Sequence, residues 1–352
     1  MLTPSAAARR FREEAAKRIL ITDGAFGTMI QTYKLSEADY RGDYDLADDQ
    51  KGNNDLLVLT RPDVIDEITR AYLDAGSDIV STNTFNANLI SQGDYSALHL
   101  VRDMNLVSAQ NARKAADEYE ARDGRPRFVA GAMGPTNKTL SLSPDVNDPG
   151  FRAVTFDEVK AIYADQAETL LEGGCDFILI ETIFDTLNAK AAIMAVLELQ
   201  DKLGREIPMM ISMTITDMSG RNLSGHSVEA FWYMIRHAKP LTVGLNCAFG
   251  ADLMRPHVQV LSGIADTLLM AYPNAGLPND LGAYDELPAK TGELIAEWVE
   301  NGLLNVVGGC CGTTPGHIAA MAKAAAGAPP RALPTPKPAM RLTGLDPFEL
   351  AA

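Results

Sequence analysis

Three of the four cysteines lie directly after short apolar segments of the sequence. Cys247 follows residues 241–246 (Leu-Thr-Val-Gly-Leu-Asn), and the adjacent Cys310 and Cys311 follow residues 303–309 (Leu-Leu-Asn-Val-Val-Gly-Gly). If both segments are strands of one barrel, the three thiols meet at its mouth. A site with three protein ligands and an open position is the catalytic form of zinc coordination. The alternative is inert packing, because cysteine is among the most buried residue types.

Three thiolates and an open position indicate a particular chemistry. Zinc held by three thiolates has one net negative charge, so it polarises carbonyl groups poorly but accepts a further thiol that loses its proton. A free thiol is mostly protonated at neutral pH, so such a site would supply the nucleophile as well as its position. The pattern therefore predicts alkyl transfer to sulfur. Gly308, Gly309 and Gly312 flank the pair and permit close backbone approach. Cys175 precedes its apolar segment, so we interpret it as a packing residue.

Two carboxylates, Asp23 and Glu181, also end apolar segments. A carboxylate that ends a buried strand is costly unless it meets a cation or hydrogen-bond donors. Asp23 could cap the backbone N–H groups of residues 24–27. The functional interpretation is recognition of an ammonium group, and both roles can hold for one residue.

The elements that must position these residues form an alternating series. Eight short apolar segments are predicted strands: 19–22, 79–83, 128–133, 177–181, 209–213, 241–246, 268–272 and 305–309. Stretches with helical spacing lie between them: 62–75, 98–119, 156–171, 186–203, 228–237, 288–299 and 315–325. Eight such units predict an α/β fold, a (β/α)₈ TIM-type barrel with the zinc site at its C-terminal mouth.

The rival fold is a doubly wound open sheet. Its Gly-x-Gly-x-x-Gly fingerprint is absent after the first strand, where the sequence has Asp-Gly-Ala-Phe-Gly at residues 23–27. We expect the barrel to occupy residues 1–327 and a Pro-rich tail or linker, residues 328–352, to be extended. Residues 135–150 are rich in Ser, Pro, Asn and Asp, which predicts a long loop at the functional end.

Composition excludes several classes of protein. The chain has 31 Lys and Arg against 46 Asp and Glu, a formal charge of −15, which disfavours nucleic-acid and anionic membrane partners. Its 46% hydrophobic and 22% charged residues are ordinary for a globular protein. No apolar run is long enough for a membrane span, and the first residues lack the apolar segment of a secretory signal. We therefore expect a cytoplasmic protein with reduced thiols.

Six longer motifs resemble the homocysteine-binding barrel of cobalamin-dependent methionine synthase. The resemblance covers about residues 10–327 and rests on ILITDGAFGTMIQ (19–31), STNTFNAN (81–88), GAMGPTNKTLSLSPDVNDPGFRAVTFDEV (131–159), ETIFDTLNAK (181–190), GLNCA (244–248) and VVGGCCGTTPGHI (306–318). It implies a (β/α)₈ barrel in which Cys247, Cys310 and Cys311 bind zinc and the homocysteine thiolate takes the open position.

The same resemblance implies contacts to the rest of homocysteine. Asp23 and Glu181 would hold the amino group, and backbone amides near Ala25 and Phe26 would bind the carboxylate. Asn83 and Asn246 are expected in the wall of the site. The six predicted substrate contacts are therefore Asp23, Ala25, Phe26, Asn83, Glu181 and Asn246.

The methyl donor that the resemblance implies is methylcobalamin. Full-length enzymes of this kind continue into folate-binding and cobalamin-binding modules, whereas this sequence ends in a segment similar to the linker before the folate barrel. We therefore expect the cobalamin to be carried by another module or polypeptide.

Three alternatives remain open at this point. The donor could be betaine or S-methylmethionine, although betaine enzymes carry a Tyr where this chain has Asn86. The chain could be a non-catalytic homocysteine-binding subunit in which zinc is only structural. Finally, it could be a metal-free barrel enzyme that uses Asp23 and Glu181 as acid and base.

Overall fold

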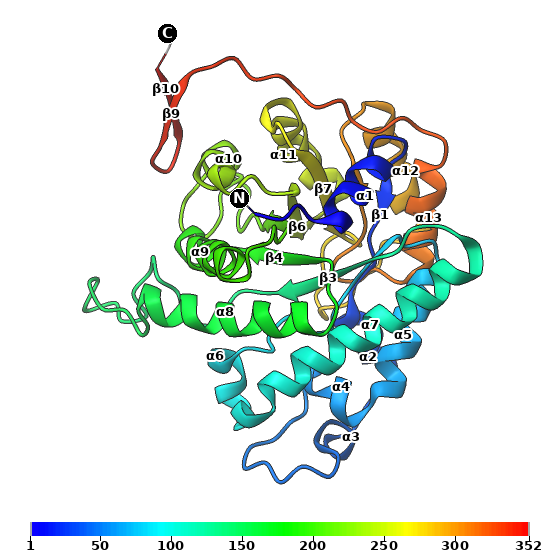
Figure 1. Ribbon diagram of the computed structural model, residues 1–352, viewed down its shortest axis with the longest axis vertical. Helices are drawn as coiled ribbons and strands as arrows, with labels where there is room; N and C mark the ends of the chain where they lie inside the picture. The colour runs from blue at the N-terminus through cyan, green and yellow to red at the C-terminus, as the bar shows by residue number, and fades with distance from the viewer. Residues whose placement is uncertain (1, 351–352) are drawn as a thin grey trace.

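The computed structural model describes residues 2–350 and contains a barrel of eight parallel strands (Figure 1). The strands are β1 (Leu20–Ile21), β2 (Ile79–Ser81), β3 (Phe128–Met133), β4 (Phe177–Ile183), β5 (Met209–Met213), β6 (Thr242–Gly250), β7 (Leu268–Asn274) and β8 (Val306–Val307). Consecutive strands from β2 to β8 pair, and β8 pairs with β1. A parallel bridge between Thr22 and Ile79 joins β1 to β2 and completes the circle. The predicted barrel is confirmed, and the doubly wound sheet is excluded.

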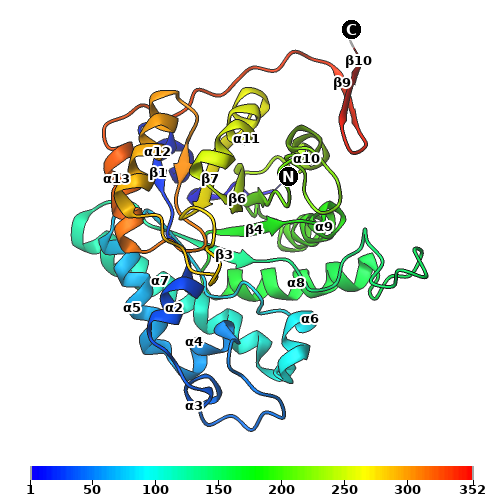
Figure 2. The same ribbon diagram turned by 180° about the vertical axis from the view of Figure 1, so that it is seen from behind.

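Each strand is followed by a helix on the outside of the barrel, as Figures 1 and 2 show from opposite sides. These helices are α5 (Pro62–Asp74), α7 (Val101–Asp123), α8 (Phe156–Glu172), α9 (Thr186–Leu203), α10 (Val228–Ile235), α11 (Ala251–Ile264), α12 (Pro288–Glu300) and α13 (Pro315–Ala325). Seven of them were predicted. The eighth, α11, contains Pro256, which removes a backbone donor and weakens the helical pattern.

The N-terminal end of the barrel is closed by a helix that the sequence did not predict. Helix α1 (Ala6–Ala15) begins after Ser5, whose hydroxyl accepts from the Ala8 amide. The ring of Phe11 packs edge-on against Phe128 and Phe177, with ring centroids 5.2 and 5.1 Å away. Burial of three aromatic rings stabilises this end of the barrel, opposite to the cysteines.

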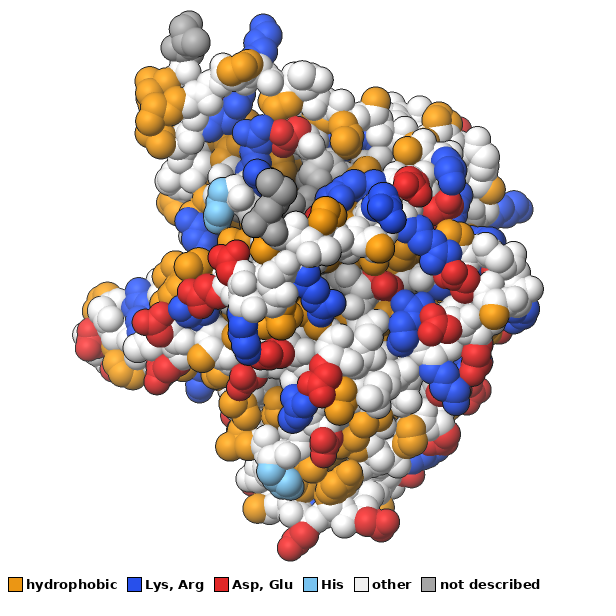
Figure 3. Space-filling view, viewed as in Figure 1, with side chains coloured by type: hydrophobic (Ala, Val, Ile, Leu, Met, Phe, Trp, Pro, Cys, Tyr) orange, Lys and Arg blue, Asp and Glu red, His pale blue; other side chains and the backbone are white. Residues whose placement is uncertain are grey.

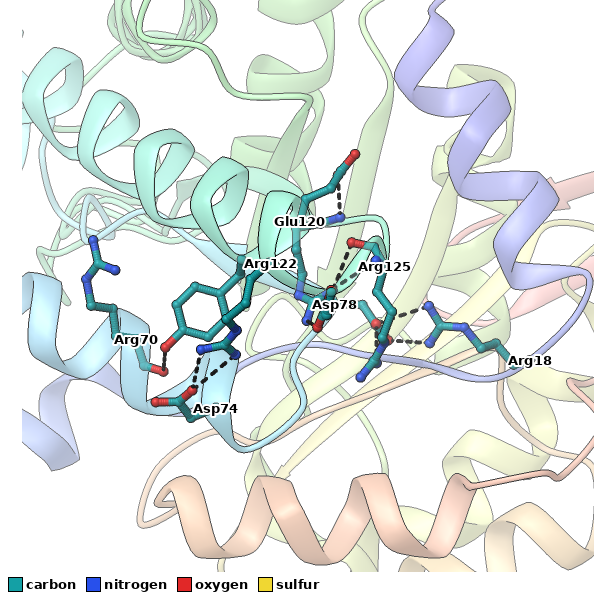
Figure 4. Close-up of polar contacts among 10 residues, drawn as sticks. Arg18, Arg70, Asp74, Asp78, Glu120, Arg122 and Arg125 are labelled. Carbon is teal, nitrogen blue, oxygen red and sulfur yellow. Dashed lines mark hydrogen bonds and ion pairs between the residues drawn. The ribbon is translucent and has the colours of Figure 1, made fainter.

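A buried ion-pair cluster ties the starts of the strands together at the same end (Figure 4). The side chain of Asp78, which has no exposed surface, accepts two hydrogen bonds from Arg18 at 2.7 and 3.1 Å and one from Arg125 at 2.8 Å. It also accepts the amide of Ile21 at 2.9 Å. These partners compensate the cost of burying the carboxylate. Because Ile21 belongs to β1 and Asp78 directly precedes β2, the cluster also fixes the two strands against each other.

The loops after β1 and β2 carry short helices that form a lobe beside the barrel (Figure 1). These are α2 (Phe26–Thr32), α3 (Glu37–Arg41), η1 (Asn54–Leu56), α4 (Leu57–Thr60), α6 (Leu89–Gln92), η2 (Gly93–Tyr95) and η3 (Leu98–Leu100), and one more 3₁₀ turn, η4 (Arg236–Ala238), follows α10. By contrast, the predicted loop after β3 has no helix or strand between β3 and α8, and it projects away from the barrel.

The Pro-rich tail is extended over residues 328–339 and then forms a hairpin that the sequence did not predict. Strand β9 (Met340–Thr343) pairs with β10 (Pro347–Leu350), and the turn between them docks beside α10. Arg221 pairs with Asp346 at 2.7 Å. Hydrophobic side chains remain exposed on the hairpin, at the upper left of Figure 3, whereas charges of both signs intermix over the rest of that face. Within residues 2–350, no helix is both long and apolar enough to span a membrane.

Candidate metal centre and substrate cavity

The three cysteines from β6 and the loop after β8 meet at the C-terminal mouth of the barrel. The sulfur atoms of Cys247, Cys310 and Cys311 all lie within 4.8 Å of one another, and those of Cys247 and Cys311 are 3.7 Å apart. This is the one group of metal-ligating side chains of its kind within residues 2–350. The predicted convergence of Cys247 with the Cys310–Cys311 pair is confirmed.

A bulge in β6 aims Cys247 into this cluster. The pairing of β6 with β7 shifts register between Asn246 and Gly250, and Cys247 and Ala248 both have a φ of 61°. Non-glycine residues rarely adopt this left-handed conformation, which costs free energy and is found where the surrounding structure imposes it. Bulges commonly redirect a side chain beside a functional site, and here the bulge turns a thiol toward the loop after β8.

The glycines around the cysteine pair are required by close packing. An added Cβ would lie 2.3 Å from the Thr22 side chain at Gly308, 2.4 Å from Thr313 at Gly309 and 2.3 Å from Tyr284 at Gly312. Gly312 also has a φ of +79°, which disfavours any side chain. The prediction that these glycines permit a tight approach at the barrel mouth is confirmed.

The thiol cluster is arranged to hold a cation. Hydrogen bonds from the other two thiols lower the pKa of Cys311 to about 3. Hydrogen bonds to Cys247 and Cys311, together with burial, raise the pKa of Cys310 well above its usual range. Without a cation, burial and mutual repulsion therefore oppose the ionisation of all three thiols. A bound metal ion would compensate all three thiolates, so the residues present fit a soft or borderline metal such as zinc.

A cavity of about 280 Å³ opens beside the cysteines and reaches into the barrel. Its lining includes all three cysteines and five of the six predicted substrate contacts, namely Asp23, Ala25, Phe26, Asn83 and Glu181. Among its lining residues, none is Lys, Arg or His. The site is therefore acidic and has no cationic side chain of its own.

Asp23 connects β1 to β2 and points into this cavity. Its Oδ2 atom accepts the amide and the hydroxyl of Ser81 at 2.7 and 2.8 Å, and Oδ1 accepts the hydroxyl of Thr22 at 3.2 Å. The interpretation of Asp23 as a cap for residues 24–27 is wrong, because its donors come from Ser81 and Thr22 instead. Burial raises the pKa of Asp23 to about 6, so its carboxylate is harder to ionise than in water and a nearby cation would favour the charged form.

Glu181 lies on the strand opposite, at a second bulge. The pairing of β4 with β5 shifts register between Ile180 and Ile183. The Tyr272 hydroxyl donates to Glu181 Oε2 at 3.1 Å. Burial, with smaller contributions from the charges of Asp23 and Cys311, raises the pKa of Glu181 to about 8. Two carboxylates that repel each other in one cavity are a suitable receptor for an ammonium group.

Asn246 lies behind the cavity wall instead of in it. Its Oδ1 atom accepts the amide of Thr182 at 3.0 Å and the hydroxyl of Ser212 at 2.7 Å. Its Nδ2 atom donates to Thr182 Oγ1 at 2.8 Å and lies 3.9 Å from Cys310 Sγ. The side chain thus links the β4 bulge next to Glu181 to the cysteine cluster, whereas the sequence had suggested a direct wall residue.

The remaining predicted contacts are the backbone N–H groups near Ala25 and Phe26 and the side-chain amide of Asn83. Ala25 precedes helix α2, whose N-terminus is not capped by a side chain, and the Ala25 amide donates to Thr313 Oγ1 at 3.3 Å. The helix N-terminus places backbone N–H groups and positive dipole at the cavity, as an anion requires. Asn83 Nδ2 donates to the backbone oxygen of Asn54 at 2.7 Å and thereby holds the start of η1.

Several residues at the site escaped the sequence analysis. Tyr272 ends a predicted strand, so alternation could have placed it inside the barrel. Asp55 lines the cavity but belongs to the polar stretch Gly-Asn-Asn-Asp, which has no periodic signal. The side-chain oxygen of Asn274 is buried and has no hydrogen-bond partner, and the next amide, Ala275, donates to the Cys311 carbonyl at 2.9 Å. Tyr284 packs over Gly312 beside the cysteines.

Two other sequence interpretations concern residues away from the cavity. Cys175 is buried against Gly131 in the hydrophobic core and does not belong to the thiol cluster, so its interpretation as packing is confirmed. Residues 135–150 lie at the expected end of the barrel, but none of them is among the residues that line the cavity.

Comparison with known proteins agrees with this geometry. A family model described as homocysteine S-methyltransferase matches residues 20–325. The homocysteine methyltransferase MmuM from Escherichia coli, in its metallated form, is 22% identical, with a TM-score of 0.67 over 90% of this chain and 98% of that chain. Its apo form is 20% identical, with a TM-score of 0.62 over 87% of this chain and 96% of that chain. Both structures therefore share their fold with this chain. Because the family match extends from β1 to the end of α13, the chain belongs to the homocysteine S-methyltransferase family.

Proposed function

We propose that this chain is a zinc-dependent enzyme that transfers the methyl group of methylcobalamin to homocysteine and so produces methionine. The observation that carries the proposal is the cysteine cluster at the edge of an acidic cavity without basic side chains. The family supplies homocysteine as the substrate. The methionine-synthase motifs of the sequence support methylcobalamin as the donor, carried by another module or polypeptide.

Cys247, Cys310 and Cys311 would hold the zinc ion. When bound, zinc supplies positive charge that lowers the pKa of a fourth thiol, so homocysteine would be bound as its thiolate. The metallated state named for the Escherichia coli relative is consistent with a metal at this site. In this chain, the β6 bulge and the glycines around the cysteine pair hold the three sulfur atoms together before any ligand binds.

The cavity would orient the remaining groups of homocysteine. Asp23 and Glu181 would bind the ammonium group, which favours the ionised form of Glu181, and the amides at the Ala25–Phe26 turn would bind the carboxylate. Asn83 would keep the adjoining loop in place. These contacts fix the amino acid at its polar end and leave its sulfur at the cysteines.

The methyl transfer is a displacement at carbon. The sulfur of homocysteine would form a bond to the methyl carbon as the bond from the donor to that carbon breaks, and the donor would keep the electron pair of the broken bond. A corrin ring is too large for a cavity of about 280 Å³, so the ring would stay outside and present its methyl group, together with the carboxamides at its edge, to the mouth. Holding the sulfur at the mouth instead of deeper in the barrel is therefore what the reaction requires.

The test measures zinc per chain on purified protein and then methionine formation from homocysteine with methylcobalamin, betaine or S-methylmethionine. We expect one zinc per chain and turnover with methylcobalamin. Turnover with another donor instead would replace the donor assignment. Binding of homocysteine without turnover would indicate the non-catalytic subunit, and activity without zinc would indicate acid–base chemistry by Asp23 and Glu181.

Two cysteine variants make this test specific. Cys310→Ala is expected to lose zinc and activity while the barrel stays folded, because its sulfur is one of three ligands. Cys175→Ala is the matched control, since it removes a buried thiol outside the cluster. Full zinc content in the Cys310→Ala variant would exclude Cys310 as a ligand.

A further inference from the structure

One buried carboxyl group in the cavity is left over when the groups of homocysteine have been assigned. Asp55, in η1, is only 5% exposed and lines the same cavity as Asp23 and Glu181. Its Oδ1 atom accepts the backbone amide of Asn86 at 2.9 Å. Within residues 2–350, its Oδ2 atom has no protein hydrogen-bond partner, and the cavity lining contains no Lys, Arg or His. Oδ2 is not among the unpaired side-chain atoms that are sealed from solvent, so it is open to the cavity. A free acceptor atom on a cavity wall is a position at which a ligand can supply a hydrogen-bond donor in place of water.

The segment that holds Asp55 is rigidly built. Next to it, Asn53 and Gln92 exchange two side-chain hydrogen bonds of 2.8 and 3.0 Å in the protein interior. Gln92 also donates to the backbone oxygen of Asn86 at 3.2 Å. Buried amide networks of this kind fix one conformation, so Asp55 is presented to the cavity by a preorganised support.

Asp55 is distinct from the pair assigned to the ammonium group. Glu181 lies in β4, whereas Asp55 lies in η1, in the segment after β1, and binds the amide of Asn86 in the segment after β2. Burial raises the pKa of Asp55 to about 7. The aromatic rings of Phe26 and Phe85 line the cavity together with Asp55. This part of the cavity therefore remains available to the second substrate.

We propose that Asp55 is a specificity-determining residue that accepts a hydrogen bond from an N–H group of the methyl donor. The inference rests on the proposed transfer to homocysteine and extends it to the donor side of the cavity. Two donors carry such a group: the side-chain carboxamides of methylcobalamin and the ammonium group of S-methylmethionine. Betaine has no N–H group, so it could not make this hydrogen bond and would meet Asp55 only through the charge of its quaternary ammonium group.

The test compares Asp55→Asn with the wild-type chain. Asn has the same shape but presents N–H groups of its own, so the KM for the donor is expected to rise about tenfold or more. The Kd for homocysteine and the zinc content are expected to stay within twofold. Asp23→Asn is the matched control, and it should weaken homocysteine binding while leaving the donor KM unchanged. If Asp55→Asn does not fold, Asp55→Ser serves the same comparison.

The outcomes separate this inference from the proposed function. Methylcobalamin and S-methylmethionine are assayed in parallel, and a raised KM for whichever one the wild type uses supports the subsite. An unchanged donor KM, a matching rise in the homocysteine Kd, or a wild type that uses only betaine would overturn it. If the wild type turns over no donor, the proposed function fails. In that case, calorimetry measures the binding of methylcobalamin to the wild type and to Asp55→Asn. The donor subsite is overturned if the two bind methylcobalamin equally or if neither binds it.

Discussion

Replacing Asn246 with Ala tests how the two bulges of the barrel mouth are held together. The side chain makes three short hydrogen bonds: it accepts from the Thr182 amide and the Ser212 hydroxyl, and it donates to the Thr182 hydroxyl. Asn246 is 1% exposed and Ser212 is fully buried, so water cannot easily replace these bonds. The variant therefore leaves polar groups of β4 and β5 without partners.

The magnitude follows from those three bonds. Each buried hydrogen bond contributes about 0.5–1.5 kcal/mol net, so Asn246→Ala is expected to lower the free energy of unfolding by about 2–4 kcal/mol. Thr182 has a φ of 56° and directly follows Glu181, and Cys247 directly follows Asn246. Relaxation of both bulges should therefore weaken homocysteine binding and zinc binding together.

The assay is urea unfolding combined with titrations of zinc and of homocysteine. Ser212→Ala is the matched control, because it removes only one of the three bonds and should lower the unfolding free energy by about 1 kcal/mol. A variant in which homocysteine affinity falls but zinc affinity does not would indicate direct substrate contact and refute the positioning role. Unchanged values for both ligands would refute the coupling altogether.

Three further outcomes are expected. Glu181→Gln should weaken homocysteine binding by about 1.5–3 kcal/mol in calorimetry, through loss of a charge-assisted contact. Glu181 has a pKa of about 8 in the absence of ligand, so homocysteine binding should release the proton of this carboxyl group. Homocysteine affinity should therefore rise with pH up to about 8, and this part of the pH dependence should be absent in Glu181→Gln. Arg331, in the tail, donates hydrogen bonds to the carbonyls of residues 262, 265 and 267. Arg331→Ala should therefore lower the free energy of unfolding by about 2–4 kcal/mol in urea unfolding. The control Lys202→Ala, which removes an exposed ion pair, should change it by under about 0.5 kcal/mol.

The strand–helix alternation was readable from the sequence because it depends on local patterns. Strands β3 and β5 have the predicted bounds, since continuous apolar runs bounded by turn residues mark buried parallel strands. Helix α1 was missed because its role is to close the barrel end through Phe11, a contact with residues more than a hundred positions away. The tail hairpin was missed for the same reason, since its turn is held by Arg221 and Ser227.

By itself, the sequence determined which side chains meet at the mouth of the barrel. Cys247, Cys310 and Cys311 end apolar strands, and parallel strands of one barrel present their ends at one mouth, so their meeting follows from the periodicity. The acidic character of the site follows likewise from Asp23 and Glu181.

Only the tertiary structure decided how each side chain is used. It assigned Asp23 to donors on β2, moved Asn246 from the wall to a position behind it, and brought Asp55 into the cavity. These outcomes depend on bulges and on contacts between distant segments, which leave no periodic pattern in the chain. Local patterns specify elements, whereas packing of elements against one another specifies the orientation, burial and pKa of the groups that they carry.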